Sequence, residues 1–349
     1  MAYGLINADI HSDSQGGVLA PISSVMRNRI INGQMQIDQR NAGASVTPTD
    51  QAYTLDRWQA QVSQTSKLTV QQNAGSVTPP VGFTNYLGVT SSSAYSITST
   101  DYFNITQNIE GYNIADLGWG TANAKTVTLS AWVYSSLTGT FGGALRNSAA
   151  NRSYPFTYTI SSANTWTQVN ITIAGDTTGT WLTTNGKGVS VIWGLGTGST
   201  YSGTAGSWSA NNYVSATGAT SVVGTNGATF YITGVQLEKG SSATGFEYRQ
   251  YQQELALCQR YFEILYMNNS TSDFISAPYG GNSNTYSNWF FHQSKRASPT
   301  IALASGASWT NTTPTIYVSV DKGLFTGTST YFYLSQTSGL SAITASSEL

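Results

Sequence analysis

Charged residues are scarce in this sequence of 349 residues, and their scarcity excludes some functions. Asp, Glu, Lys and Arg together make up 9% of the chain, whereas an ordinary soluble domain has roughly 25%. The formal net charge is −1, so the chain lacks the positive field that a phosphate backbone requires. We therefore expect no nucleic-acid partner. A surface of hydroxyls and amides suits neutral polar ligands or close packing with copies of the same chain.

Cysteine and histidine are also nearly missing. Cys258 is the single cysteine, so no intrachain disulfide can form. One cysteine and two histidines, His11 and His292, cannot build a Cys/His zinc site. No nucleophile elbow accompanies His292, and no phosphate-binding glycine loop is present. We expect no cofactor and no metal, although calcium stays open, with Asp38 and nearby carbonyls as the candidate ligands.

Long hydrophobic segments are missing as well. No apolar run approaches the roughly 20 residues of a membrane span, and the first residues lack the basic and apolar blocks of a signal peptide. We expect a protein made in a cytoplasm, without membrane insertion or classical export. Its composition is nevertheless that of an exposed surface protein. A virion component, made inside a host cell and released by lysis, satisfies both expectations.

Gly, Ser, Thr, Asn and aromatic residues fill the gap that the charged residues leave. Aromatics reach 12%, with 9 Trp and 21 Tyr. Runs of Leu, Ala, Glu and Lys, which build long helices, are nearly absent. The pattern indicates an all-β chain, with roughly ten short strands joined by Gly/Ser/Asn turns and arranged as a two-sheet jelly-roll sandwich.

The most regular strand pattern runs from Lys125 to Ser136. Its aliphatic residues alternate with polar ones, which predicts a half-buried strand. The core-facing residues are Val127, Leu129, Ala131 and Val133. The opposite face carries Trp132 and Tyr134 among hydroxyls, so this face is expected either to pack against something or to offer a platform for a ligand.

Other segments alternate less strictly. The first strand is expected at Ile31, Met35 and Ile37, with Asn32-Gly33 as a turn or bulge. Further strands are expected at Tyr86–Thr90, Tyr102–Ile109, Tyr154–Ile160, Trp166–Ala174, Val189–Leu195 and Thr229–Glu238, with a bulge at Gly234. Gly139 to Arg152 is predicted to be a long loop. Gly196 to Gly227 is a low-complexity loop that holds Tyr201, Trp208 and Tyr213, and these spaced aromatics favour a functional loop over disorder.

The chain divides into four expected parts. Residues 1–27 show no period and form either a disordered leader or an arm that attaches to a virion partner. Residues 28–249 form the jelly-roll domain. Residues 250–263 form a connecting helix, because Tyr251, Leu255, Cys258 and Phe262 make one helical stripe. Residues 264–349 form a smaller β region that buries little alone, so we expect a tip or a trimerisation domain.

Aromatic side chains on or beside the predicted sheets are the candidate ligand contacts. Sugar rings pack on aromatic planes, and Asn, Gln, Ser and Thr bind their hydroxyls. The candidates are Trp132, Tyr134, Trp181, Trp208 and Tyr213; Trp193 is expected in the core. The alternative is that the rings only pack.

Paired carboxylates for glycoside cleavage are the remaining catalytic option. The candidate acids are Asp101, Glu110, Asp116 and Asp176. Isolated acids in loops more often cap turns or face solvent, so we expect no catalytic residue and no enzyme.

Five motifs together resemble one protein family. They are N-R-I-I-N-G-Q-M-Q-I-D-Q-R-N at 28–41, L-D-R-W at 55–58, V-T-L-S-A-W-V at 127–133, T-F-Y-I-T-G-V-Q-L-E-K-G-S-S-A-T-G-F-E-Y-R at 229–249 and E-L-A-L-C-Q-R-Y-F-E at 254–263. They are similar to a module of bacteriophage tail fibres and related virion surface fibres. The body also resembles jelly-roll carbohydrate-binding modules. The resemblance implies a non-enzymatic, glycan-facing virion protein that assembles as a homotrimer, and it transfers no binding site.

The leading hypothesis is therefore a phage structural protein whose jelly roll binds host-surface glycan. Its expected partners are other virion proteins through the arm, a host glycan and two copies of itself. A second hypothesis is a purely architectural head-decoration or fibre-adaptor protein without a ligand. A third is a glycan depolymerase.

Overall fold

The computed structural model describes residues 11–12, 18–19, 27–267, 277–278, 285–303, 307–310, 313–327, 333–336 and 341–349. The predicted arm, 1–27, therefore lies outside the described residues except for Arg27 and the short pair β1 (His11–Ser12) and β2 (Val18–Leu19). No helix in the described part of the chain has the length and apolar character needed to span a membrane.

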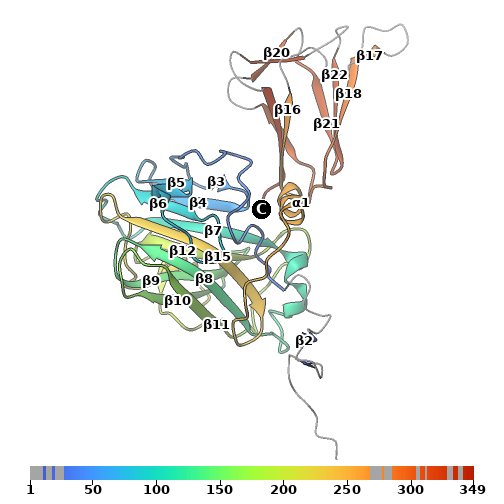
Figure 1. Cartoon of the computed structure of the whole chain (residues 1–349). Helices are drawn as coiled ribbons and strands as arrows, with labels where there is room; N and C mark the ends of the chain where they lie inside the picture. The colour runs from blue at the N-terminus through green and yellow to red at the C-terminus, as the bar shows by residue number, and fades with distance from the viewer. Residues whose placement is uncertain are drawn as a thin grey trace, which may run out of the picture.

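Two antiparallel sheets, stacked face to face, form the body of the molecule (Figure 1). The six-stranded sheet has the order β10 (Ser153–Ile160), β9 (Gly139–Asn147), β12 (Lys187–Thr197), β7 (Tyr102–Glu110), β4 (Trp58–Val62) and β3 (Ala52–Leu55). The five-stranded sheet has the order β11 (Thr167–Ile173), β8 (Val127–Ser135), β15 (Thr229–Lys239), β6 (Leu87–Ser91) and β5 (Leu68–Gln72). The chain thus has the all-β jelly-roll sandwich that its composition predicts.

The core lies between the two sheets and follows the predicted alternation. The aliphatic side chains of β8 point inward and are buried, as the pattern at Lys125–Ser136 predicts. Trp193 on β12 is 0% exposed and packs edge-on against Phe156 and Tyr158, so its predicted burial is confirmed. The bulge predicted at Gly234 is also present, because the register of β15 against β8 shifts between Thr233 and Gln236.

The first expected strand is absent. Residues 28–40 form turns and irregular structure, because Asn32 and Met35 have positive φ values of 59° and 58°, which no extended strand permits. The segment still lies along the last strand of the sandwich: the Arg29 amide donates to the Leu237 carbonyl, and the Val235 amide donates to the Gly33 carbonyl.

The loop predicted at Gly139–Arg152 is mostly strand β9, because its glycines are close-packing positions instead of turn residues. A Cβ at Gly143 would lie 2.2 Å from the Ile192 carbonyl oxygen, and one at Gly142 would lie 2.6 Å from the Ser215 hydroxyl. Only a residue without a side chain fits such contacts.

Ser215 belongs to the long segment that follows β12. This segment contains the two-residue strands β13 (Ser202–Gly203) and β14 (Ser215–Ala216). Because the Cβ positions of both Gly142 on β9 and Gly194 on β12 lie against Ser215, β14 must cover the outer face of the six-stranded sheet. Short 3₁₀ turns, η2 (Ala74–Ser76), η3 (Gly111–Asn113) and η4 (Ala115–Leu117), complete the sandwich.

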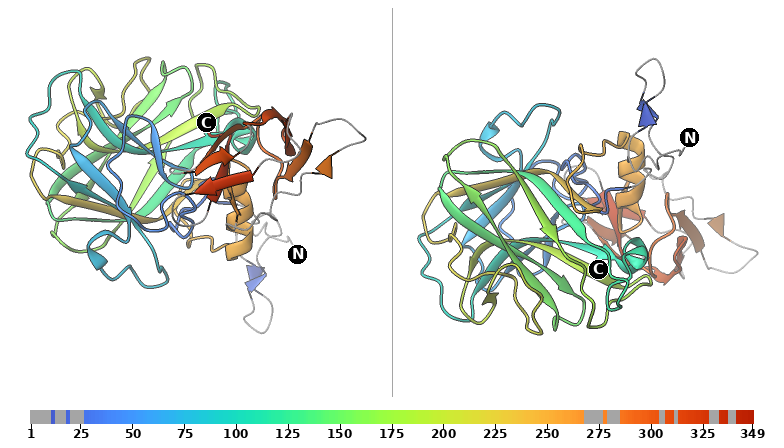
Figure 2. Two further views of the ribbon diagram at one scale, coloured as in Figure 1. Left: turned by 90° about the horizontal axis from the view of Figure 1, so that it is seen from above. Right: turned by 90° about the horizontal axis from the view of Figure 1, so that it is seen from below.

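The helix α1 (Tyr251–Gln259) lies at the joint between the sandwich and a second β unit (Figures 1 and 2). The predicted helical stripe is shorter than expected. Tyr251 is 53% exposed, and Phe262 already belongs to strand β16, so only Leu255 and Cys258 of the stripe pack from the helix. Cys258 is fully buried, and burial raises the pKa of its thiol, as expected of a packing residue.

The second unit is built from short strands around a small core. They are β16 (Phe262–Met267), β17 (Ala277–Pro278), β18 (Thr285–Phe290), β19 (Thr300–Leu303), β20 (Ala307–Thr310), β21 (Thr315–Val318), β22 (Lys322–Gly327), β23 (Tyr333–Gln336) and β24 (Ser341–Ser346). The core residues are Trp289, Phe325, Ile343 and Ala345. The last residues, 347–349, return to the sandwich, where the Leu349 carbonyl accepts hydrogen bonds from Tyr53 and Asn108.

Buried charges tie the two units together. Arg57, only 1% exposed, pairs with Glu348, and its guanidinium lies 3.6 Å from the centre of the Tyr261 ring. Glu110, at the end of β7, accepts hydrogen bonds from Arg260 (2.7 Å) and from the Tyr261 hydroxyl (2.6 Å). Removing one partner of such a pair would leave a buried charge uncompensated, so each pair holds the joint in one arrangement.

The buried Asp56 gives the sandwich a testable pH dependence. Burial raises the pKa of Asp56 to about 6, although Gln39 donates two hydrogen bonds to its carboxylate. The folded chain therefore holds this proton more tightly than the unfolded chain, and the stability that Asp56 contributes is lost as the pH rises from about 4 through 6. We expect Asp56→Asn to gain stability relative to the wild type over this interval, by roughly 3 kcal/mol.

Urea unfolding of both proteins at pH 4, 5, 6 and 7 measures this difference directly. Two stability curves that run parallel across the interval would contradict a raised pKa at Asp56.

Candidate functional site

The five aromatic residues predicted as ligand contacts lie at three separate places. Trp132 and Tyr134 stand on the outer face of the five-stranded sheet, because they alternate with the core residues of β8. Trp181 and Trp208 meet beside Trp119. Tyr213 follows Asn212 in the long segment after β12. The structure therefore brings the predicted residues together only in pairs.

Tyr134 belongs to an aromatic cluster that packs on itself. Its ring stacks on Tyr231 at 5.1 Å and 7°, and Trp166 lies against Tyr134 and Tyr86. Ala74 and Val77 pack over the same cluster, and the Trp166 indole donates to the Thr78 carbonyl. Tyr134 therefore packs within this cluster, and its contact with a ligand stays a prediction. Trp132 is half-buried, and both its ring and that of Phe83 lie within contact of a Cβ at Gly234.

Trp181 and Trp208 seal one edge of the core. Trp181 is buried, and Trp208 is half-buried against the same cluster. The Trp208 indole donates to the Ala174 carbonyl (2.7 Å) and the Trp181 indole donates to Asp176 (3.2 Å). These indoles already have partners within the protein, so their role in ligand contact stays a prediction that their packing does not favour.

The four candidate acids all have partners in the fold. Asp101 accepts from Ser63, Tyr95 and Thr98, Glu110 from Arg260 and Tyr261, Asp116 from Arg29, and Asp176 from Arg152, Thr178 and Trp181. Burial raises the pKa of each carboxyl, but hydrogen bonds, joined by nearby cations at Glu110, Asp116 and Asp176, lower it below its ordinary value. Asp38, the candidate calcium ligand, caps a turn by accepting from the Asn41 and Gly43 amides.

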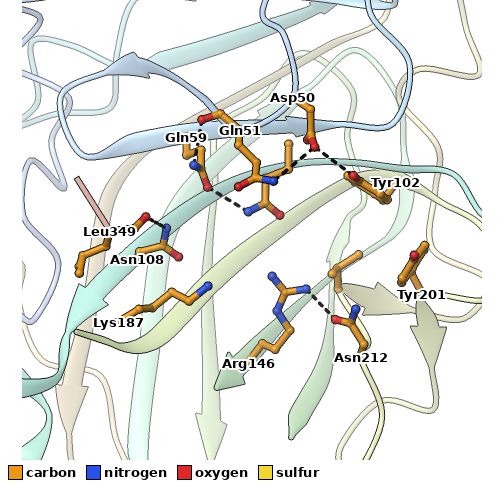
Figure 3. A pocket seen from close by; sticks show the side chains of 12 residues that line it. Asp50, Gln51, Gln59, Tyr102, Asn108, Arg146, Lys187, Tyr201, Asn212 and Leu349 are labelled. Atoms are coloured by element: carbon orange, nitrogen blue, oxygen red, sulfur yellow. Dashed lines mark hydrogen bonds between the residues drawn. The ribbon is translucent and has the colours of Figure 1, made fainter. Parts of the chain in front are cut away.

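A cleft of about 300 Å³ lies on the outer face of the six-stranded sheet (Figure 3). Its floor comes from strands whose opposite faces form the core. In β4, Trp58, Ala60 and Val62 point inward, which turns Gln59 and Gln61 toward the cleft. The same alternation on β7 brings Tyr102 and Asn108 to this face. The full lining is Asp50, Gln51, Gln59, Gln61, Tyr102, Asn108, Arg146, Lys187, Tyr201, Asn212, Val214 and Leu349.

Side-chain amides on the floor hold one another in place. The Gln61 amide donates to the Gln59 carbonyl oxygen at 2.9 Å, and Gln59 donates to the Gln51 backbone carbonyl at 2.9 Å. Asn108 accepts from the Ser190 hydroxyl at 2.7 Å and donates to the Leu349 carbonyl at 3.0 Å. Groups oriented in this way can bind a polar ligand without first losing side-chain freedom.

Two tyrosines lie next to each other in the cleft (Figure 3). The Asp50 carboxylate accepts from the Tyr102 hydroxyl (3.1 Å) and the Val62 amide (2.9 Å). The long segment after β12 supplies Tyr201 and Asn212. The two tyrosine rings lie 5.4 Å apart and are nearly perpendicular, at 87°. Both rings are half-buried, so part of each remains accessible from the cleft.

Two cations also reach the cleft, Arg146 from β9 and Lys187 from the start of β12 (Figure 3). Arg146 donates to the Asn212 side-chain oxygen at 2.7 Å. Burial lowers the pKa of Arg146, and burial together with the neighbouring Arg146 lowers the pKa of Lys187. Both groups therefore sit in a poorly solvated place beside a like charge.

The cleft has the chemistry of a binding site. It offers amide donors and acceptors, two cations and two partly accessible aromatic rings. Within the described residues, no group of three His, Cys, Asp or Glu side chains could hold a metal ion. Asp50 is the one Asp or Glu among the lining residues, so the cleft lacks a pair of side-chain carboxylates.

None of the lining residues is among the five predicted ligand contacts, because those five were chosen for their large aromatic rings. The signal that could have found the cleft is the run of amides on the polar face of two strands, at Gln59 and Gln61 and at Asn104 and Asn108. Solvated strand faces normally carry charges and hydroxyls. The segment Gly196–Gly227 was expected to be functional for its aromatics, and its Tyr201 does line the cleft. Tyr213 adjoins the lining residues Asn212 and Val214, and its ring packs on Gly203.

No protein-family model and no curated protein matches the chain. Among solved structures, the chain is similar to a putative sugar binding protein from Bacteroides thetaiotaomicron, at 13% identity and a TM-score of 0.36 over 61% of this chain and all (100%) of that one. It is similar to TmCBM61 in complex with β-1,4-galactotriose, at 9% identity and a TM-score of 0.30 over 61% of this chain and 99% of that one.

A third similar structure is the enzymatically active domain of bacteriophage CBA120 tailspike protein 4, at 12% identity and a TM-score of 0.34. The match covers 61% of this chain but only 22% of the tailspike chain. At these identities and TM-scores, the likeness assigns no ligand to this chain.

The packed indoles can be tested by their effect on stability. We expect Trp181→Ala to lower the free energy of unfolding by about 3–5 kcal/mol, because it empties a buried site between Trp119 and Trp208. Tyr112→Ala is the matched control, since its exposed ring should change stability by no more than about 0.5 kcal/mol. Chemical denaturation gives both values. Equal stability of the two variants would show that Trp181 is not a packing residue.

Proposed function

We propose that this protein binds a saccharide in the cleft on its six-stranded sheet. The observation that carries the proposal is the convergence, in one cleft, of two accessible tyrosine rings with a network of oriented side-chain amides. Sugar rings present C–H faces that pack on aromatic planes, and their hydroxyls both donate and accept hydrogen bonds. A cleft that offers both kinds of contact, without paired carboxylates, is suited to binding and not to cleavage.

The expected position of the sugar follows from the contact between the two tyrosines. A sugar ring cannot enter between their rings, which touch, but it can pack on the accessible part of Tyr201 beside Tyr102, over the floor to which Gln59 and Gln61 contribute. The Tyr102 hydroxyl is occupied by Asp50, which fixes the orientation of that ring. Tyr201 has no hydrogen bond to its hydroxyl among the described residues, so both its face and its hydroxyl are available to a ligand.

We further propose that the chain acts on a phage virion as a surface fibre that attaches to host glycan. The motif resemblance at 28–41, 55–58, 127–133, 229–249 and 254–263 supports this role, as does the low charge of the chain. Its composition fits a part that is made in a host cytoplasm and released with the particle. Adsorption of the parent phage to cells, competed by the purified protein, tests this wider role.

The Tyr201 ring provides the direct test of saccharide binding. On an array of neutral and acidic oligosaccharides, we expect the wild type to bind a defined set, and we expect Tyr201→Ala to weaken binding to that set roughly two- to tenfold, because it removes one stacking face. Isothermal titration with the best oligosaccharide measures the change.

Tyr112→Ala is the control, since Tyr112 is an exposed tyrosine outside the cleft. Trp132→Ala and Trp208→Ala test the residues predicted from sequence. Should these two abolish binding while Tyr201→Ala leaves it intact, the site would lie elsewhere. Should no oligosaccharide bind the wild type, the proposed function itself would be wrong.

A second candidate function, architecture through self-association, is favoured by the second β unit. Phe290 and Tyr317 are 68% and 61% exposed. Phe290 pairs with Lys322 and Tyr317 with Leu324, and these two partners lie two residues apart on β22. All four side chains therefore share the face opposite the small core. An exposed apolar face on a unit this small suits contact with further copies of the chain, as the expected homotrimer requires.

Light scattering coupled to size-exclusion chromatography tests the homotrimer. We expect the mass of three chains for the wild type, and a shift toward the monomer for a double variant, Phe290→Ser with Tyr317→Ser, because it removes apolar area from the contact. Tyr112→Ser is the control on the sandwich. A wild type that elutes as a monomer would contradict the homotrimer and leave saccharide binding untouched.

A further inference from the structure

We propose that the saccharide bound in this cleft carries an anionic substituent, a carboxylate or a sulfate, which Arg146 and Lys187 bind together. The inference rests on the proposed function and specifies the ligand class of the same site. It comes from the side of the cleft away from Asp50, where Arg146 and Lys187 lie near each other and neither has an ion pair among the described residues (Figure 3).

Arg146 and Lys187 differ from the other cations of the sandwich and its joint. Most of these are paired with carboxylates: Arg27 with Glu238, Arg29 and Lys239 with Asp116, Arg40 and Arg57 with Glu348, Arg152 with Asp176, Arg249 with Glu254, and Arg260 with Glu110. Within the described ranges, neither Arg146 nor Lys187 has an ion pair. A chain with so few charges thus leaves two of them uncompensated in one cleft.

The guanidinium of Arg146 is only partly satisfied. One of its terminal nitrogens donates to Asn212, and its Nε is buried with no hydrogen-bond partner in the described structure. Asn212 holds the group in place without neutralising it, since an amide oxygen carries no net charge. A buried donor of a charged group that lacks a partner is costly, and an anion is the partner that would compensate it best.

Lys187 has neither a hydrogen bond nor an ion pair to any described residue. Its ammonium lies close enough to Arg146 for the two to repel each other, and burial adds to the penalty. Two like charges held together in a poorly solvated site destabilise the free protein. An anion placed between them would remove both penalties at once, so the site favours a charged ligand over a neutral one of the same shape.

Asp50 does not serve as the counterion. Its carboxylate is already bound to the Val62 amide and the Tyr102 hydroxyl on the opposite side of the cleft. At the inner end, the Leu349 carbonyl accepts from Asn108 and Tyr53. The charges of the cleft are therefore separated: Asp50 is bound on one side, and Arg146 and Lys187 lie on the other, with both tyrosines within electrostatic reach of Arg146. An acidic sugar would place its ring at the tyrosines and its anionic group beside Arg146 and Lys187.

The test compares two oligosaccharides that differ only in the group at C6. Trigalacturonate and α-1,4-galactotriose share their linkage and the arrangement of their ring hydroxyls, but the first carries a carboxylate where the second has a neutral CH₂OH group. Isothermal titration of the full chain should show tighter binding of trigalacturonate, by about tenfold or more, as expected for hydrogen bonds to a charged group. A sulfated galactan oligosaccharide forms the third arm and distinguishes sulfate from carboxylate.

Variants locate the effect in the cleft. Arg146→Gln and Lys187→Gln should each remove most of the preference for the anionic probe and leave binding of galactotriose within about twofold, because the stacking and amide contacts remain. Lys187→Arg keeps the charge and should keep the preference. Lys125→Gln is the matched control, because Lys125 is an exposed lysine that does not line the cleft. Thermal unfolding verifies that each variant is folded.

The outcomes separate this inference from the proposed function. A neutral probe that binds as tightly as both anionic ones, with no response to Arg146→Gln or Lys187→Gln, would overturn the anionic ligand and leave saccharide binding standing. An equal loss of the preference in Lys125→Gln would also overturn it, because the attraction would then be a general field. Absence of binding to all three probes and to the oligosaccharide array would refute both.

Discussion

The fold depends on placing its few charged side chains against one another in buried positions. Arg57 pairs with Glu348, and Arg260 with Glu110, across the joint between the sandwich and the second unit. Each of these pairs links segments far apart in the sequence, so the joint forms only when both are folded. Because loss of either partner would leave the other charge buried and uncompensated, these pairs favour the arrangement of the two units in which they form.

Two cations of the sandwich are exceptions to this pairing of charged side chains. Arg146 and Lys187 are held in a cleft without counterions, on a sheet face whose remaining groups are amides and tyrosines. Inward alternation on β4, β7 and β9 builds the core and directs their polar groups to the opposite face, and a register shift between Lys187 and Val189 interrupts the alternation of β12 at Lys187. The long segment after β12 folds over that face, close against Gly142 and Gly194, and closes one wall. One face of the six-stranded sheet therefore packs in the core, and the other face lines the cleft.

The local sequence pattern predicted the structural features that depend on residues close together in the chain. The strand at Lys125–Ser136, the bulge at Gly234 and the burial of Trp193 follow from alternation and from glycine, and the structure confirms them. The local pattern gave a wrong prediction for features that depend on residues distant in the sequence. Gly142 and Gly143 resemble turn glycines, yet they lie inside β9, because Ser215 and Ile192 approach them from other parts of the chain.

The candidate site shows the same division. Composition and local pattern by themselves determined an all-β sandwich with a polar, weakly charged surface. They suffice for this because strand alternation and turn residues act over a few neighbouring positions. Only the tertiary structure decided that Tyr134 and Trp181 pack inside the protein while Tyr102, Tyr201, Arg146 and Lys187 meet in one cleft. These four residues come from strands and a loop that are distant in sequence, and sheet order and the fold of that loop bring them together.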